Sequence, residues 1–182
     1  MSFKSDIRTL TTGAITELNE LNAKIKDLES KKEGYYKPTY EAMMKELTDK
    51  RDSLILGTER KARELADAYK KSVKERFTPK GAELTDDAAL LTSGLTLTGA
   101  ELDALFDKHK GNNTMQRLIG EYAAKNEVTS FTRVVATEAT YHEAADTMLA
   151  YTRNALQRPE YADIMLTDDY FAKITPDVMK ED

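Results

Sequence analysis

The chain has 182 residues, of which 32% are charged and 40% hydrophobic, with eight Gly, four Pro and no Cys. Turn residues this scarce exclude a β-sandwich, which needs a turn about every 8–12 residues. The lack of Cys excludes a disulfide framework and a thiolate metal site. The net charge of −5 is segregated, because residues 50–80 carry ten Lys or Arg against five Asp or Glu, whereas residues 81–182 carry nine against eighteen. Since helix formers such as Ala, Glu, Lys and Leu are abundant, we expect an all-α protein.

The first predicted helix extends from about Ser5 to Glu33. Its apolar or small residues recur with alternating gaps of four and three, the heptad spacing of a coiled coil. They are Ile7, Thr11, Ala14, Leu18, Leu21, Ile25 and Leu28. The pattern stops at residues 34–38, where Gly34 suits a helix end and Pro38 disfavours helical backbone before it. This break predicts an αα-hairpin, and a kink in one very long helix is the alternative.

The second predicted helix, Thr39 to Phe77, is longer than most globular helices and therefore needs a partner helix or a partner subunit. Apolar residues of both helices form a predicted oligomerisation seam: Leu18, Leu21, Ile25 and Leu28, opposite Leu47, Leu54 and Leu65. The end of this helix carries a predicted basic patch: Arg60, Lys61, Arg63, Lys70, Lys71, Lys74 and Arg76. Acidic residues are interleaved with these, which is typical of an exposed helix face with ion pairs.

Pro79 and Gly81 mark the clearest boundary in the chain, so we expect a helical hairpin over residues 1–79 and a compact helical domain over residues 80–182. The second domain is predicted to contain short helices that begin near Thr85, Thr98 and Thr114, since Thr is a good N-cap residue. Thr98 and Glu101 have the spacing of a capping box. A longer helix is expected over residues 130–157, followed by an apolar tail and a last short helix from Thr167 to Pro176.

No catalytic or cofactor-binding motif is evident in the sequence. Phosphate-binding glycine loops and a nucleophile elbow are absent. Glu138, His142 and Asp146 share one helical face, but no second helix offers a matching Glu-x-x-His motif. Asp103 and Asp107 lie near His109, and solvation at the start of a helix explains them equally well. We therefore expect no enzyme, no metal and no cofactor.

Residues 85–126 resemble small helical modules in structural and head-morphogenesis proteins of tailed bacteriophages and prophages, where the module follows a long charged coiled coil. The matching residues are Thr85 to Gly94, Leu97-Thr98, Glu101-Leu102, Leu105-Phe106, Lys108, Asn112 to Met115, Ile119 and Tyr122-Ala123. The resemblance implies a capsid-associated, neck or scaffold protein of the virion, and it carries over no functional residue.

The expected function is a non-enzymatic phage structural or assembly role, in which the seam joins copies of the chain and segregated charge orients them. Other virion or assembly proteins are the expected further partners. The alternatives are a DNA-binding protein that uses the basic patch, and a cellular coiled-coil adaptor. No stretch approaches the length and apolarity of a membrane span, and no secretory signal is evident at the N-terminus. We therefore expect the chain in the virion, or in the host cytoplasm during assembly.

Overall fold

The structure is a computed structural model that describes residues 2–133, 135 and 137–161. In this part of the chain every regular element is a helix and no strand occurs, which confirms the all-α fold class. The predicted helix from Thr167 to Pro176 lies outside the described residues, as does the apolar tail after Tyr161.

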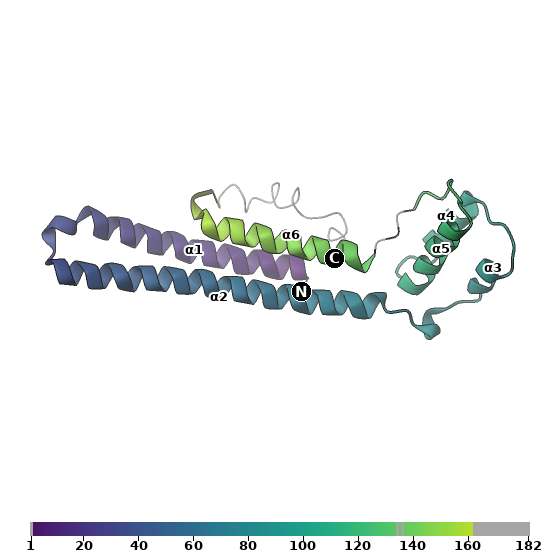
Figure 1. Ribbon diagram of the computed structural model, residues 1–182, viewed down its shortest axis with the longest axis horizontal. Helices are drawn as coiled ribbons and strands as arrows, with labels where there is room; N and C mark the ends of the chain where they lie inside the picture. Colours follow the sequence, from purple (N-terminus) through teal and green to yellow (C-terminus); the bar gives the residue numbers. More distant parts are fainter. Residues whose placement is uncertain (1, 134, 136, 162–182) are drawn as a thin grey trace. The chain divides into compact units, whose positions relative to one another are not determined.

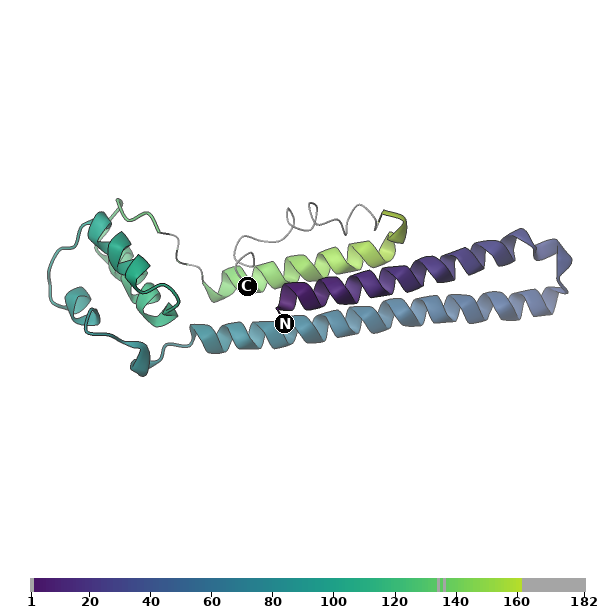
Figure 2. The same ribbon diagram turned by 180° about the vertical axis from the view of Figure 1, so that it is seen from behind.

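Two long helices form the predicted N-terminal hairpin. Helix α1 covers Phe3–Ser30, helix α2 covers Lys37–Phe77, and the 3-10 turn η1 at Lys32–Gly34 joins them. Figures 1 and 2 show α1 returning alongside α2, so the hairpin is confirmed and the single kinked helix is not formed. Pro38 stands in the first turn of α2, where a backbone N–H has no intrahelical partner to lose.

A third long helix, α6 at Glu138–Gln157, packs along the hairpin. Met148 of α6 lies in one buried cluster with Ile7 of α1 and Ala62 of α2. Leu156, near the end of α6, lies in a second buried cluster with Leu18 of α1. The contacting residues of α6 include several alanines, whose small side chains allow close helix approach. Three helices therefore share this core, whereas the hairpin sequence alone supplies two.

A pair of buried threonines joins α1 to α6 inside this core. The Oγ1 atoms of Thr11 and Thr152 lie 3.1 Å apart. The two hydroxyls also reach carbonyl oxygens of their own helices, at Ile7 (2.7 Å) and at Met148 (3.1 Å). Both hydroxyls therefore have hydrogen-bond partners without water, and their pairing favours one register between the helices.

The chain divides differently from the predicted boundary near residue 80. One unit combines the chain up to Lys70 with the chain from Tyr141 onward, and Lys71–Thr140 form the second unit. Residues 80–182 are therefore not one domain. The reason is that the apolar face of α6 is buried against α1 and α2 of the first unit.

The second unit contains three shorter helices, α3 at Ala88–Thr92, α4 at Gly99–Lys108 and α5 at Asn113–Lys125. Their shared core holds Leu91, Leu102 and Ile119, one from each helix. The capping box of α4 is present as predicted, since Thr98 N–H donates to Glu101 Oε2 at 2.8 Å while Glu101 N–H donates to Thr98 Oγ1 at 3.4 Å.

Two predicted N-caps are wrong. Asn112 caps α5 by accepting a hydrogen bond from Met115 N–H at 3.0 Å, whereas Thr114 lies inside the helix and donates to Glu83. At α3 the Thr85 side chain makes no cap, and its carbonyl oxygen accepts from Ala88 N–H at 2.9 Å instead. The Thr114 side chain is taken up by Glu83, and the Thr85 side chain lies 3.5 Å from His109 Nε2.

The helix predicted over residues 130–157 starts eight residues later than expected, at Glu138. Residues 128–133, which we call the strap, instead cross the α4–α5 pair. Phe131 of the strap meets Phe106 edge to face, with ring centroids 5.9 Å apart. Thr132 donates to Asp103 through its amide and its hydroxyl, and Arg133 pairs with Asp107. These contacts hold side chains that helical spacing had assigned to α6.

Candidate interaction surface

Among the described residues, the part of the hairpin nearest its turn consists of two helices, α1 and α2. Figures 1 and 2 show α1 and α2 continuing beyond the end of α6. We call residues 21–51 the arm. At its inner limit Leu18 is 1% exposed, whereas Met43 is 38% exposed and Tyr36 77% exposed. Apolar groups of the arm therefore remain in contact with water in the described structure.

The predicted seam divides by burial into two groups. Leu18, Ile25 and Leu28 are buried within the chain. The other members are half-buried: Leu21, Leu47, Leu54 and Leu65. Leu54 packs beside Ile55 against the cluster of Leu18 and Leu156. The seam thus contributes to packing within one chain, and its half-buried members retain surface for further contacts.

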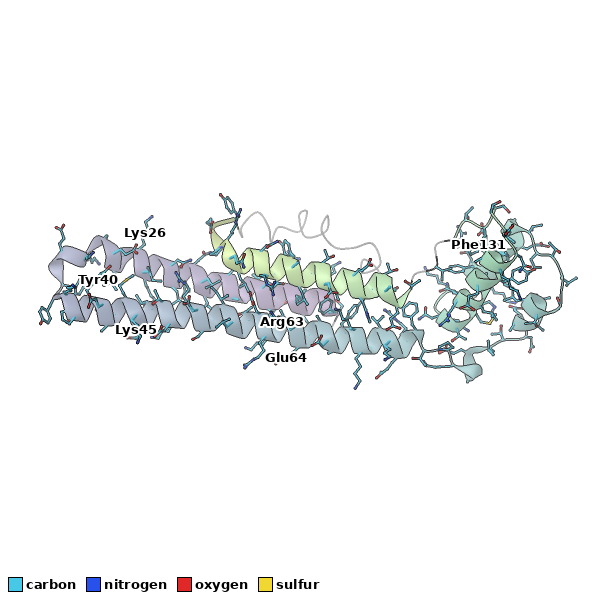
Figure 3. The ribbon with its side chains drawn as sticks, in the orientation of Figure 1. Lys26, Tyr40, Lys45, Arg63, Glu64 and Phe131 are labelled. Carbon is cyan, nitrogen blue, oxygen red and sulfur yellow. The ribbon has the colours of Figure 1, made fainter. Side chains whose placement is uncertain are left out.

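Charged side chains surround the apolar residues of the arm and pair along their own helices. Lys31 Nζ lies 2.7 Å from Asp27 Oδ2, and this hydrogen bond raises the pKa of Lys31. Lys50 Nζ lies 2.6 Å from Glu46 Oε1, and this contact lowers the pKa of Glu46. Both pairs have the i,i+4 spacing that supports an exposed helix. Figure 3 shows Lys26 and Lys45 pointing to opposite sides of the hairpin and Tyr40 between the two helices.

The turn of the hairpin is rich in tyrosine and lysine. Residues 31–39 are all exposed, and they include Tyr35 and Tyr36. Lys32 Nζ lies 5.8 Å from the ring centroid of Tyr40, which is a cation–π distance. Exposed tyrosines present a large rigid contact area at low entropic cost, so they are common at protein interfaces.

Part of the predicted basic patch pairs with neighbouring acids. Arg60 pairs with Glu64 at 3.8 Å, Arg63 with Glu59 at 3.9 Å and Lys70 with Asp146 at 2.6 Å. Lys61, Lys71 and Lys74 are exposed, whereas Arg76 is half-buried. Pairing of this kind does not favour the patch as a phosphate-binding surface, which needs cationic groups to exchange counterions.

The residues considered for a metal site have structural roles. His142 Nε2–H donates to the carbonyl oxygen of Lys70 at 3.3 Å, and Asp146 pairs with the ammonium group of that same lysine. Asp103 and Asp107 hold the strap. Within the described residues no group of three or more His, Cys, Asp or Glu side chains could hold a metal ion.

His109 belongs to a buried polar contact that the sequence did not indicate. Its Nε2 lies 2.7 Å from Asp87 Oδ2, and the same carboxylate oxygen accepts from Lys108 Nζ at 2.7 Å. Hydrogen bonds from Lys108 and then from His109 lower the pKa of Asp87. The contact fastens the start of α3 to the end of α4, and no pattern in the sequence links residues 22 positions apart.

A shallow groove of about 170 Å³ lies between α2 and α6. Its lining includes Glu59, Arg63, Asp146 and Arg153. Glu59 lies within ion-pair distance of both arginines, and Asp146 pairs with Lys70. Because these charges already pair with each other, we assign no ligand to the groove.

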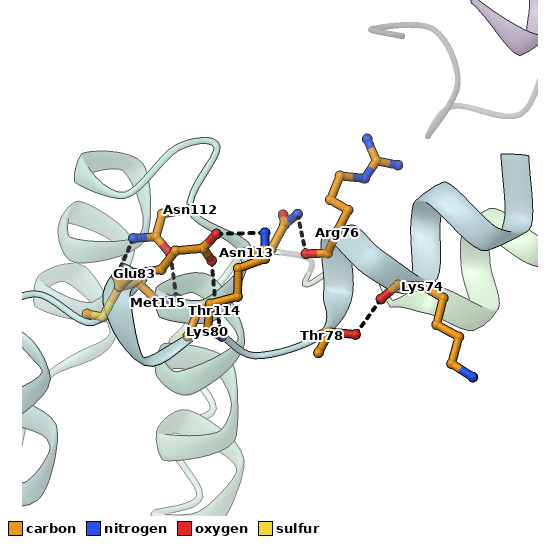
Figure 4. Close-up of polar contacts among 9 residues, drawn as sticks. All are labelled: Lys74, Arg76, Thr78, Lys80, Glu83, Asn112, Asn113, Thr114 and Met115. Carbon is orange, nitrogen blue, oxygen red and sulfur yellow. Dashed lines mark hydrogen bonds and ion pairs between the residues drawn. The ribbon is translucent and has the colours of Figure 1, made fainter.

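The segment after α2 is anchored to α5 within the second unit (Figure 4). Thr114 Oγ1 donates to Glu83 Oε2 at 2.6 Å, and Asn112 Nδ2 donates to the carbonyl oxygen of Glu83 at 2.7 Å. Lys80 Nζ lies 3.2 Å from Glu83 Oε1. The hydrogen bond from Thr114 and then that from Lys80 lower the pKa of Glu83. Within the second unit, the residues that follow Pro79 are therefore held against α5.

Comparisons of the chain with protein-family models, with curated proteins and with solved structures found no match. Of the helices in the described part of the chain, none is both long and apolar enough to cross a lipid bilayer. The role of the arm is therefore inferred from the exposure and charge of its side chains.

Proposed function

We propose that the chain is a non-enzymatic structural or assembly protein that self-associates through the arm. The observation that carries the proposal is the contrast in burial along one hairpin, from Leu18 at 1% exposed to Met43 at 38% and Tyr36 at 77%. Burial of apolar and aromatic surface drives most protein association. A second copy would shield these groups from water.

The resemblance of residues 85–126 to phage structural modules supports placing this assembly role in a tailed-phage particle. Genes for portal, terminase or capsid proteins beside the gene for this chain would support the phage role. Their absence, together with a cellular coiled-coil partner recovered with the chain, would favour a cellular adaptor.

Self-association is tested by the native mass of the chain as a function of concentration, with light scattering after size exclusion. We expect oligomers for the natural chain and a shift to monomers for Tyr36→Ser combined with Met43→Glu. Leu56→Glu is the matched control, because Leu56 is 67% exposed on α2 but lies outside the arm. A monomeric natural chain at all concentrations, or equal masses for arm variant and control, would refute the proposal.

A further inference from the structure

The three-helix part of the first unit ends where α6 ends. Pro159–Tyr161 form the 3-10 turn η3, which packs against α1. The chain therefore leaves the described part of the structure beside α1, at the end of the unit from which the arm extends. From that point 21 further residues follow in the sequence.

Those residues, 162–182, have a composition that suits the arm. They contain eight large apolar residues: Ile164, Met165, Leu166, Tyr170, Phe171, Ile174, Val178 and Met179. Contact between such a segment and another apolar surface lowers the free energy, because both surfaces are removed from water.

The charges of the two segments are opposite. The arm carries eight Lys or Arg against six Asp or Glu, whereas residues 162–182 carry two against six. Opposite net charges favour encounter and orientation.

The distances allow the contact within one chain. An extended segment of 21 residues reaches at most about 70 Å. The arm portion of α1, Leu21 to Ser30, spans roughly 15 Å at the helical rise. The segment can therefore follow the arm over its whole length and still have chain to spare.

We propose that residues 162–182 pack in cis along the arm and cover its half-buried apolar residues, so that self-association requires their release. The second half of this statement rests on the function proposed above, because it takes the arm as the associating surface. The C-terminal segment then acts as a built-in competitor of the neighbouring copy.

Cross-linking in the full chain tests the contact directly, because the natural sequence has no Cys. Met43→Cys with Phe171→Cys is compared with Leu56→Cys and Phe171→Cys under mild oxidation. We expect the arm pair to form an intramolecular disulfide at least tenfold faster than the control pair, seen as a fast-migrating monomer on a non-reducing gel. Equal rates would overturn the proposal, as would disulfide-linked dimers formed by the arm pair, since those place the segment of a neighbouring copy on the arm.

A second variant separates the two proposals. Phe171→Asp with Ile174→Asp in the full chain is expected to free the arm and lower the concentration for half-maximal oligomer formation by at least fivefold. A rapid cis disulfide in a chain that never forms oligomers would keep the segment on the arm and refute self-association. If the Asp variant forms oligomers at the same concentrations as the natural chain, residues 162–182 do not compete with a neighbouring copy for the arm. The arm would then remain the associating surface.

Discussion

Truncation of two leucines on the same helix tests whether the end of α6 divides the hairpin into a closed part and an open part. Leu18 is 1% exposed and contacts a cluster that includes Leu156 of α6, whereas Leu21 is half-buried on the arm. Leu18→Ala removes three carbons from a closed core. At about 0.8 kcal/mol for each buried CH₂, with a further cost for the cavity, the expected loss is about 3 kcal/mol.

For Leu21→Ala the expected loss is about 1 kcal/mol, because its side chain is partly in water already and no closed cavity forms. Urea unfolding of a monomeric sample, followed by far-UV circular dichroism, gives both values. Hydrogen exchange with mass spectrometry locates the change, and Leu18→Ala is expected to weaken protection in peptides of α6 as well as α1. Equal losses for the two variants would refute the reasoning, as would a Leu18→Ala protein with unchanged protection in α6.

Three further predictions concern the second unit and α1. Gly99→Ala is expected to cost about 1–3 kcal/mol and to raise hydrogen exchange in the strap, because a Cβ there would lie 2.3 Å from the carbonyl carbon of Ser130. Gly13→Ala is its control, since it has open space and is expected to stabilise α1 by up to about 1 kcal/mol. Hydrogen bonds from Thr132 lower the pKa of Asp103, so the stability they contribute is present above the unfolded pKa near ~3.9 and lost as pH falls through the folded value. NMR of the Thr132 amide between about pH 6 and pH 2 is expected to show this loss, and Asp103→Asn should abolish the pH dependence. Thr98→Ala is expected to cost about 1 kcal/mol by removing the cap of α4, and a thermal unfolding midpoint equal to that of the natural chain would contradict this.

The sequence was sufficient where local interactions decide the structure. Thr98 and Glu101 are three residues apart, and their capping box forms because both partners lie on one helix turn. The five-residue break between two apolar repeats likewise predicted the hairpin, with a single kinked helix as the alternative. In both cases the predictive signal lies in residues close together along the chain.

The sequence was insufficient to predict the structure where residues distant along the chain compete for contact with one side chain. Phe131 fits the helical repeat that continues into α6, but in the structure it packs against Phe106 and the α4–α5 pair instead. Periodicity likewise shows that α6 has an apolar face without showing what that face will meet. For the arm, the repeat identified Leu21 and Leu28 equally, but Leu28 is buried in the structure whereas Leu21 is half-buried.

Because the chain is synthesised from its N-terminus, the contact between Thr11 and Thr152 cannot form until most of α6 has been made. The hairpin is complete once Phe77 has been made, but its third helix ends about 80 residues later, and at 5–20 residues per second the ribosome needs roughly 4–16 s for that interval. Until Met148 has been synthesised, the hairpin face that contains Ile7 and Ala62 is exposed to water and to other nascent chains. A polysome with many copies in this condition would favour premature contacts between them, so slow translation or the binding of a chaperone to the first 77 residues is expected to matter more for yield than the final stability.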